Sequence, residues 1–197
     1  MSGSRSRSAW PWVVAASVLA ALLLCVEIVV GDWGLRTVEA RALVAAVQAS
    51  EQVMTDATDD FKRILDAAGS DPDQAAKEKM ATELQAAAAS AADRLRRTGE
   101  ALVDLRIAPW NRRVETARRA YQAHNAAWQA YLDAGAQDPT TLFTAQPDIE
   151  STWNTVTQTL PAVVPAPDVL GLGAEVSTLI TDGSASDDGG GSGGQSA

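Results

Sequence analysis

The chain begins with a long apolar run and continues with apolar residues that recur every three or four positions. The run covers residues 10–30 and is interrupted only by Ser17 and Glu27. As an α-helix, these 21 residues would be about 31 Å long, close to the thickness of the hydrocarbon core of a bilayer. The pattern predicts a transmembrane helix at 10–30, with Glu27 near enough to one end for its carboxylate to reach the interface.

The apolar residues after this run mark four amphipathic segments. Their positions alternate steps of three and four, the seven-residue repeat of helices packed side by side in a left-handed bundle. The repeat comprises Ala40, Leu43, Val47, Ser50, Met54, Ala57, Phe61, Ile64 and Ala68, then Ala81, Leu84, Ala88, Ala91, Leu95, Thr98, Leu102 and Leu105, then Trp110, Val114, Ala117, Tyr121, His124, Trp128 and Tyr131, and finally Ile149, Trp153, Val156 and Leu160. We expect an all-α fold, in which a single N-terminal transmembrane helix is followed by an antiparallel helical bundle over residues 35–160. The bundle is expected to contain three long helices and a shorter fourth.

Helix-breaking residues fall between these segments. Gly69 suits a left-handed end to a first helix over 35–68. Asp71 is expected to cap a second helix over about 73–107, with the proline after it at the first helical position. Pro109 should separate this helix from the third, because proline lacks a backbone N–H and clashes within a helix.

The remaining segments are richer in proline, glycine and serine. We expect a loop at 135–146 and a fourth helix that opens at 147. Residues 161–182 are predicted to be an extended, proline-rich segment with one short helix at 174–181. Residues 183–197 read as a disordered Gly/Ser tail.

The flanks of the apolar run indicate its orientation. Arg5 and Arg7 precede it without a neighbouring acidic residue, which favours a cytoplasmic N-terminal tail over residues 1–9. Tryptophans at both ends of the run suit the two interfaces of a membrane. The expected location is the cell membrane, single-pass, with the N-terminus cytoplasmic and the C-terminal domain extracytoplasmic.

Three alternatives compete with an uncleaved anchor. One is a buried core helix, for which 21 residues between flanking tryptophans are too long and too uniformly apolar. A cleaved signal peptide would need a small-x-small site soon after the apolar run, but the first such site lies at residues 40–42. A lipoprotein signal is the third alternative, since Leu22-Leu23-Leu24-Cys25 resembles a lipobox. That motif has a small residue where Leu24 stands, so the match to a lipobox is incomplete. Whether Cys25 is lipidated stays open.

Charge is distributed unevenly along the chain. The net charge is -9, yet half of the sixteen lysines and arginines fall around the break near Pro109. They are Arg94, Arg96, Arg97, Arg106, Arg112, Arg113, Arg118 and Arg119. Two helices of equal length would return this break to the membrane, which predicts a basic collar on anionic lipid headgroups or on an acidic partner. The alternative is a solvated helix face whose arginines pair with nearby carboxylates, as Arg96 could with Glu100.

An aromatic stripe on the third helix is the other candidate site. Tyr121, His124, Trp128 and Tyr131 share one face and could line a pocket for a small apolar ligand or lipid. Core packing is the competing interpretation. A haem or metal site would need a second strong ligand, and no paired-histidine or Cys-x-x-Cys spacing is present, so we expect no cofactor and no metal.

The function expected from these patterns is not enzymatic. The chain has no nucleophile elbow and no glycine-rich phosphate loop, and its acidic balance argues against nucleic acid. We expect a scaffold or accessory subunit in the cell envelope, whose partners are the membrane and either an integral-membrane protein or a second copy of the chain.

The second interpretation is a helical domain that senses a ligand, or binds a lipid or small molecule, and modulates a partner. The predicted layout resembles the extracytoplasmic four-helix domains of bacterial chemoreceptors, which also follow an N-terminal span. That resemblance implies ligand sensing outside the cell. Nine residues before the span are too few for an output domain, so a sensor of this kind would act through a partner.

Overall fold

A computed structural model describes residues 10–144 and 146–187, and every regular element in them is helical. In chain order the elements are α1 (Trp10–Ala68), α2 (Gln74–Asp104), α3 (Arg112–Gln137), the 3-10 helix η1 (Pro139–Phe143), α4 (Pro147–Thr159), the 3-10 helix η2 (Leu160–Val163) and α5 (Leu172–Asp187). The predicted all-α class is therefore confirmed. The tail residues 1–9 and 188–197, with Arg5 and Arg7, lie outside the described residues.

The chain divides into two compact units, residues 1–38 and residues 39–197, and α1 contributes to both. In the first unit the large apolar side chains that are described between Val18 and Val30, a set without Ile28, are exposed. Among the described residues, α1 alone is long and apolar enough to cross a membrane, judged by length and composition. Closer to the second unit, Asp32 and Arg36 form an ion pair at 2.8 Å one helical turn apart.

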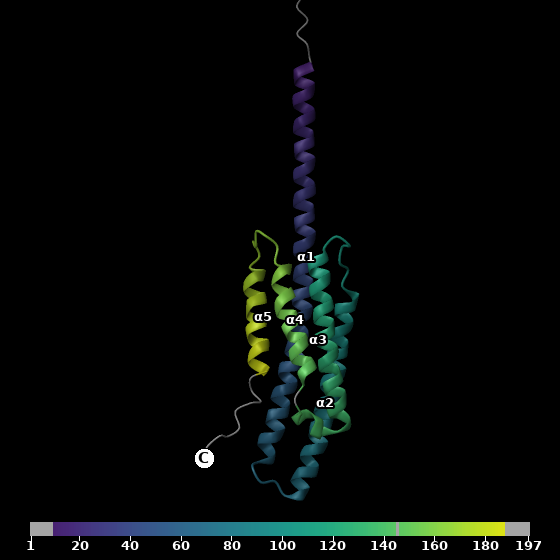
Figure 1. The fold of residues 1–197 in the computed structure, drawn as a ribbon, viewed down its shortest axis with the longest axis vertical. Helices are drawn as coiled ribbons and strands as arrows, with labels where there is room; N and C mark the ends of the chain where they lie inside the picture. The colour runs from purple at the N-terminus through teal and green to yellow at the C-terminus, as the bar shows by residue number, and fades with distance from the viewer. Residues whose placement is uncertain (1–9, 145, 188–197) are drawn as a thin grey trace, which may run out of the picture. The chain divides into compact units, whose positions relative to one another are not determined.

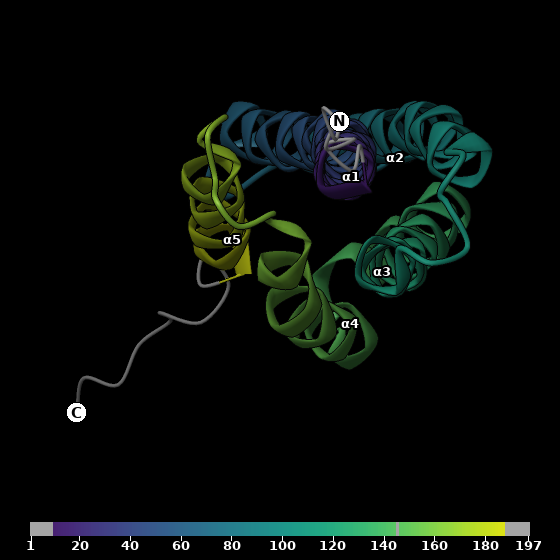
Figure 2. The same cartoon turned by 90° about the horizontal axis from the view of Figure 1, so that it is seen from above.

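In the second unit, α2, α3, α4 and α5 run alongside one another (Figure 1) and follow in that order when viewed end-on (Figure 2). Two apolar clusters hold the helices together. The larger cluster joins Leu43 of α1 and Leu102 of α2 to Tyr121, Trp153 and Leu172 of the three later helices. The smaller cluster joins α1, α2 and α3 through Met54, Leu95 and Leu132, among other residues.

Most positions of the predicted apolar repeat are buried. The buried ones are Ala40, Leu43, Val47, Ser50, Met54, Ala57, Ile64, Leu84, Ala88, Ala91, Leu95, Leu102, Val114, Ala117, Tyr121, His124, Ile149, Trp153, Val156 and Leu160. Trp110 is an exception, because its side chain is 60% exposed. It lies in the turn before α3 rather than in the helix, so it is not part of the third stripe.

The helix ends differ from the sequence prediction at two connections. Gly69 adopts the expected left-handed conformation, with φ +77°. The cap of α2 is Asp73 and not Asp71: the Asp73 carboxylate accepts a hydrogen bond from the backbone N–H of Ala76 at 2.8 Å. Between α2 and α3 the non-helical segment is longer than one proline requires, covering residues 105–111.

Three segments predicted to lack regular structure are partly helical. Residues 135–137 extend α3, and η1 occupies most of the predicted loop that follows. Residues 161–163 form η2 instead of extended chain, because proline is tolerated in the first turn of a helix. Finally, α5 continues through residues 183–187, beyond the predicted start of the tail. Extending an existing helix gains one backbone hydrogen bond for each residue that is fixed, so extension is easier than nucleation of a new helix.

Candidate functional site

The predicted basic collar divides into paired and unpaired arginines. Within α2, the Arg94 guanidinium lies 3.1 Å from the Asp56 carboxylate of α1. Arg96 lies 2.6 Å from Asp93 and 3.7 Å from Asp133 of α3. These two arginines precede the end of α2 by eight and ten residues, which is about 12–15 Å along a helix. They therefore pair with carboxylates along the helices instead of gathering at the turn.

Two more of these arginines are held by one carboxylate on the first turns of α3. Arg118 Nε lies 2.9 Å from Glu115, and Arg119 Nε lies 2.6 Å from it. Hydrogen bonds from Arg118 are the main reason that the pKa of Glu115 is below its usual value. Arg118 also donates to the backbone oxygens of Leu102 and Val103, at 3.4 and 3.3 Å. It thereby satisfies carbonyl groups left open at the end of α2.

The turn itself is fixed by a carboxylate from another helix. Glu39 of α1 accepts a hydrogen bond from the Ala108 backbone N–H and another from Asn111 Nδ2, both at 2.7 Å. Asn111 is the residue before α3, and its side chain makes no capping bond to that helix. Glu39 thus ties residues 105–111 to the start of the α1 segment that belongs to the second unit.

The other arginines of the collar face solvent. Arg97, Arg106, Arg112 and Arg113 are exposed, and no ion pair to any of them is found in the part of the chain that the structure describes. An open cavity of about 570 Å³ lies beside the turn. It is lined by Ile107, Ala108, Pro109, Arg112, Glu115, Thr116, Arg118 and Arg119. The basic region at this end of the unit therefore centres on the turn and the first turns of α3.

The aromatic stripe lies in the interior of the second unit. The Tyr121 hydroxyl donates to Glu51 at 2.8 Å and also lies 3.3 Å from the Val47 carbonyl oxygen. Burial, and then the nearby Glu51 charge, raise the pKa of Tyr121 well above its usual value. At the far end of the stripe, Trp128 and Tyr131 meet edge-on with ring centroids 5.7 Å apart. These side chains join helices, and none of them lines the cavities described here.

His124 is enclosed by aromatic rings, and its Nε2 lies 3.9 Å from the Glu51 carboxylate. Its ring centroid lies 5.9 Å from that of Tyr121 and 5.0 Å from that of Trp153. The Thr152 hydroxyl donates to backbone carbonyls of α4 and lies 3.1 Å from His124 Nδ1, so we assign the ring proton to Nδ1. Burial lowers the pKa of His124 to about 4, which keeps the ring neutral at pH 7.

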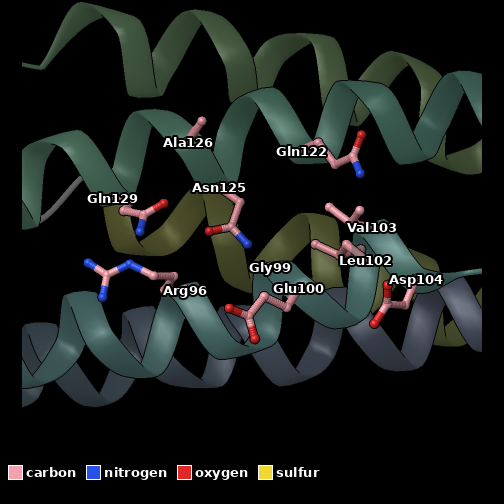
Figure 3. Close-up of a pocket in the computed structure, with 10 residues that line it drawn as sticks. All are labelled: Arg96, Gly99, Glu100, Leu102, Val103, Asp104, Gln122, Asn125, Ala126 and Gln129. Carbon is pink, nitrogen blue, oxygen red and sulfur yellow. The ribbon is translucent and has the colours of Figure 1, made fainter.

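A groove between α2 and α3, absent from the sequence prediction, contains an unpartnered amide. It has a volume of about 510 Å³ and is lined by Arg96, Gly99, Glu100, Leu102, Val103, Asp104, Gln122, Asn125, Ala126 and Gln129 (Figure 3). Asn125 is 5% exposed, and its Nδ2 has no hydrogen-bond partner among the described residues. A Cβ at Gly99 would lie 3.2 Å from this nitrogen. Glycine at position 99 therefore leaves room for the amide, a pairing that residue spacing within one helix cannot reveal.

No group of three His, Cys, Asp or Glu side chains that could hold a metal ion is present in the described residues. Comparison of the chain with protein-family models, with curated proteins and with solved structures found no match.

Proposed function

We propose that this chain is a non-enzymatic, membrane-anchored protein of the cell envelope that acts as a scaffold or accessory subunit. In this proposal residues 10–30 span the membrane, the N-terminus is cytoplasmic, and the second unit is an extracytoplasmic, antiparallel helical bundle. Glu39 of α1 accepts a hydrogen bond from Ala108, just after α2, and Asp56 of α1 pairs with Arg94 of α2. The residue number rises along α1 as that of its partner falls, which supports opposite directions for the two helices.

One observation carries the anchoring proposal: the large apolar side chains described between Val18 and Val30 of α1 are exposed. The large residues Val18, Leu19, Leu22, Leu23, Leu24, Val26, Val29 and Val30 are each more than half exposed. Burying a side chain of this size contributes about 1.5–3 kcal/mol. Eight of them would together favour an apolar environment by roughly 12–24 kcal/mol, and a bilayer supplies such an environment along this length of helix.

Cysteine labelling on intact cells tests the anchor and its orientation together. Cys25→Ser removes the only native thiol, and Lys77→Cys or Ser4→Cys then introduces one thiol in α2 or in the N-terminal tail. A membrane-impermeant maleimide should label position 77 on intact cells and position 4 only after lysis. Labelling of position 4 alone on intact cells would show that the topology is inverted. Mass spectrometry of the purified chain distinguishes a cleaved signal peptide, which would remove position 4 altogether.

The accessory role is tested by isolating the chain from native membranes. An affinity tag on the N-terminus, followed by extraction in a mild detergent, should recover a stoichiometric complex with an integral-membrane protein or with a second copy. A tag on an unrelated single-span protein of equal abundance provides the background. Recovery of a lone monomer under conditions that preserve other envelope complexes would contradict the accessory role.

The groove between α2 and α3 favours a second candidate, the binding of a small polar ligand. The observation in its favour is the buried Nδ2 of Asn125, which faces the groove without a partner (Figure 3). Native mass spectrometry of the full chain should then show an added mass that Asn125→Ala removes. Gln137→Ala, an exposed amide of the same helix outside the groove, is the control. An unliganded mass for the native chain would contradict this candidate.

A further inference from the structure

Two connections of the second unit expose large apolar side chains at the same end. Trp110, in the turn between α2 and α3, is 60% exposed. In the connection between η2 and α5, Val169 is 63% exposed and Leu170 is 43% exposed. Figure 1 shows both connections at one end of the unit. Ile107 of the first connection and Val164 of the second also pack against the same apolar cluster.

Hydrogen bonds and a left-handed glycine fix the backbone of the second connection, and its apolar residues are exposed. The Asp168 carboxylate accepts hydrogen bonds from the backbone N–H of Leu172 at 3.0 Å and of Gly173 at 2.8 Å, so it caps α5. Gly171 has φ +72°, a conformation that favours glycine. The cap and the left-handed turn fix the backbone on both sides of Val169 and Leu170, which remain directed away from the core.

Charge at this end is largely positive once the internal pairs are considered. Glu39 is engaged by the turn, Glu115 by two arginines, and Asp168 by the first N–H groups of α5. Among the described residues, Arg106, Arg112 and Arg113 are exposed and have no described ion pair. The nearby carboxylate of Asp104 is likewise exposed and has no described ion pair. In the segments next to Trp110, three exposed arginines without a described ion pair thus outnumber one such carboxylate, Asp104. Such a mixture is typical of surfaces that enter the headgroup region of an anionic bilayer.

We propose that this end of the second unit is a lipid-docking surface. Trp110, Val169 and Leu170 enter the interfacial layer, and Arg106, Arg112 and Arg113 contact the phosphates of anionic lipids. A bilayer is the occupant that chain connectivity favours, because Glu39, which binds the turn, follows Val30 by only nine residues in the sequence. This inference rests on the proposed anchor, and it adds a second membrane contact that holds the helical unit against the lipid surface.

Site-specific quenching by lipids tests the apolar contact in the full chain. With Cys25→Ser as background, Leu170→Cys is labelled with an environment-sensitive fluorophore, and the chain is placed in nanodiscs of equal phosphatidylcholine and phosphatidylglycerol. Phe143→Cys is the matched control, because Phe143 is 60% exposed in η1, which follows the other end of α3. Nitroxide-bearing lipid should quench position 170 at least about threefold more than position 143. Equal quenching at the two positions would overturn the proposal.

The charge contribution is tested in the same labelled chain. Arg112→Gln with Arg113→Gln should reduce the quenching at position 170 to the level seen in phosphatidylcholine alone. Arg63→Gln with Lys62→Gln removes the same charge from exposed residues of α1 away from this end and should leave the quenching unchanged. An equal effect of the two double variants, or no effect of the first, would overturn the role of the arginines.

The remaining outcomes separate this inference from the proposed anchor. Flotation and alkaline extraction of the same samples report whether the chain is integral. A chain that floats and resists extraction, yet shows no quenching at position 170, overturns the docking surface and leaves the anchor intact. A chain that is extracted refutes both. Protection of position 170 only after a membrane protein extract is added would assign this surface to a protein partner and also overturn the lipid assignment.

Discussion

Replacement of Glu39 by alanine should release the turn between α2 and α3. The carboxylate accepts two hydrogen bonds, from the Ala108 N–H and from Asn111 Nδ2, each at 2.7 Å. Hydrogen bonds to a charged group contribute about 1.5–3 kcal/mol each. Both are partly buried and water can reach part of the gap, so we expect Glu39→Ala to lower the free energy of unfolding by about 2–4 kcal/mol. The amide of buried Asn111 would lose its partner as well.

Thermal unfolding of the full chain in a mild detergent, followed by circular dichroism, measures this loss. For a chain of this size, each 1 kcal/mol corresponds to about 2–4 °C in Tm, so Glu39→Ala should lower Tm by roughly 4–16 °C. Hydrogen exchange at the Ala108 amide should also become faster. Glu39→Gln is the control: its amide oxygen can still accept from Ala108, and its NH₂ can donate to Asn111 Oδ1 after that amide flips. We expect it to cost about 1 kcal/mol.

A double-mutant cycle determines whether the effect comes from this contact. If Glu39 acts through Asn111, then Glu39→Ala and Asn111→Ala should be coupled by about 1–2 kcal/mol. Strictly additive losses would show that the two side chains are energetically independent. A glutamine variant as unstable as the alanine variant would likewise contradict the hydrogen-bond account, because glutamine keeps the shape and can make both hydrogen bonds once the Asn111 amide flips.

Three further predictions concern the interior and the helix contacts. The pKa of His124 is about 4 in the folded chain and about 6.5 in the unfolded chain. The free energy of unfolding should therefore be unaffected by His124 above pH 6.5 and should fall by about 2–3 kcal/mol as pH drops to 4. His124→Gln should flatten this part of the curve of stability against pH, and an unchanged slope would contradict the prediction. A Cβ at Gly135 would lie 2.3 Å from Leu142 Cδ2, so Gly135→Ala should destabilise the chain by about 1–2 kcal/mol despite better helix propensity, and Leu142→Ala should remove that penalty in a double-mutant cycle. The Arg94–Asp56 pair is partly exposed, so Asp56→Asn should change stability by less than about 1 kcal/mol, as measured by denaturant unfolding, and a larger loss would show that the pair is not solvent-screened.

The sequence predicts the buried faces of the helices well because burial follows the helical period. Leu43, Met54 and Leu95 lie in the predicted stripes and are buried. Leu132 is also fully buried but lies one position outside the predicted stripe of α3. The reason is that α3 packs against α2, α4 and η1, so more than one of its faces is covered. A single stripe cannot represent a helix with several neighbours.

The candidate sites were harder to predict, since their geometry depends on residues far apart in the sequence. The clustering of arginines was visible, but the carboxylate that engages Arg94 comes from α1, and one of the two carboxylates near Arg96 comes from α3. The same holds for Glu39, which lies 69 positions before its partner Ala108. Local spacing identifies the charge of a segment, whereas tertiary pairing decides which of its charges are still available to bind something else.

That distinction divides the basic residues near the turn by their physical role. Arg118 donates to a carboxylate and to two carbonyl oxygens at the end of α2, so its hydrogen-bonding capacity is used within the chain. Arg112 and Arg113 lie at the N-terminus of α3, where the helix dipole disfavours positive charge. No ion pair within the described residues offsets that cost for them. An anionic surface in contact with Arg112 and Arg113 would offset this unfavourable charge at the helix end. Their position beside exposed Trp110 therefore supports the proposed contact with anionic lipid.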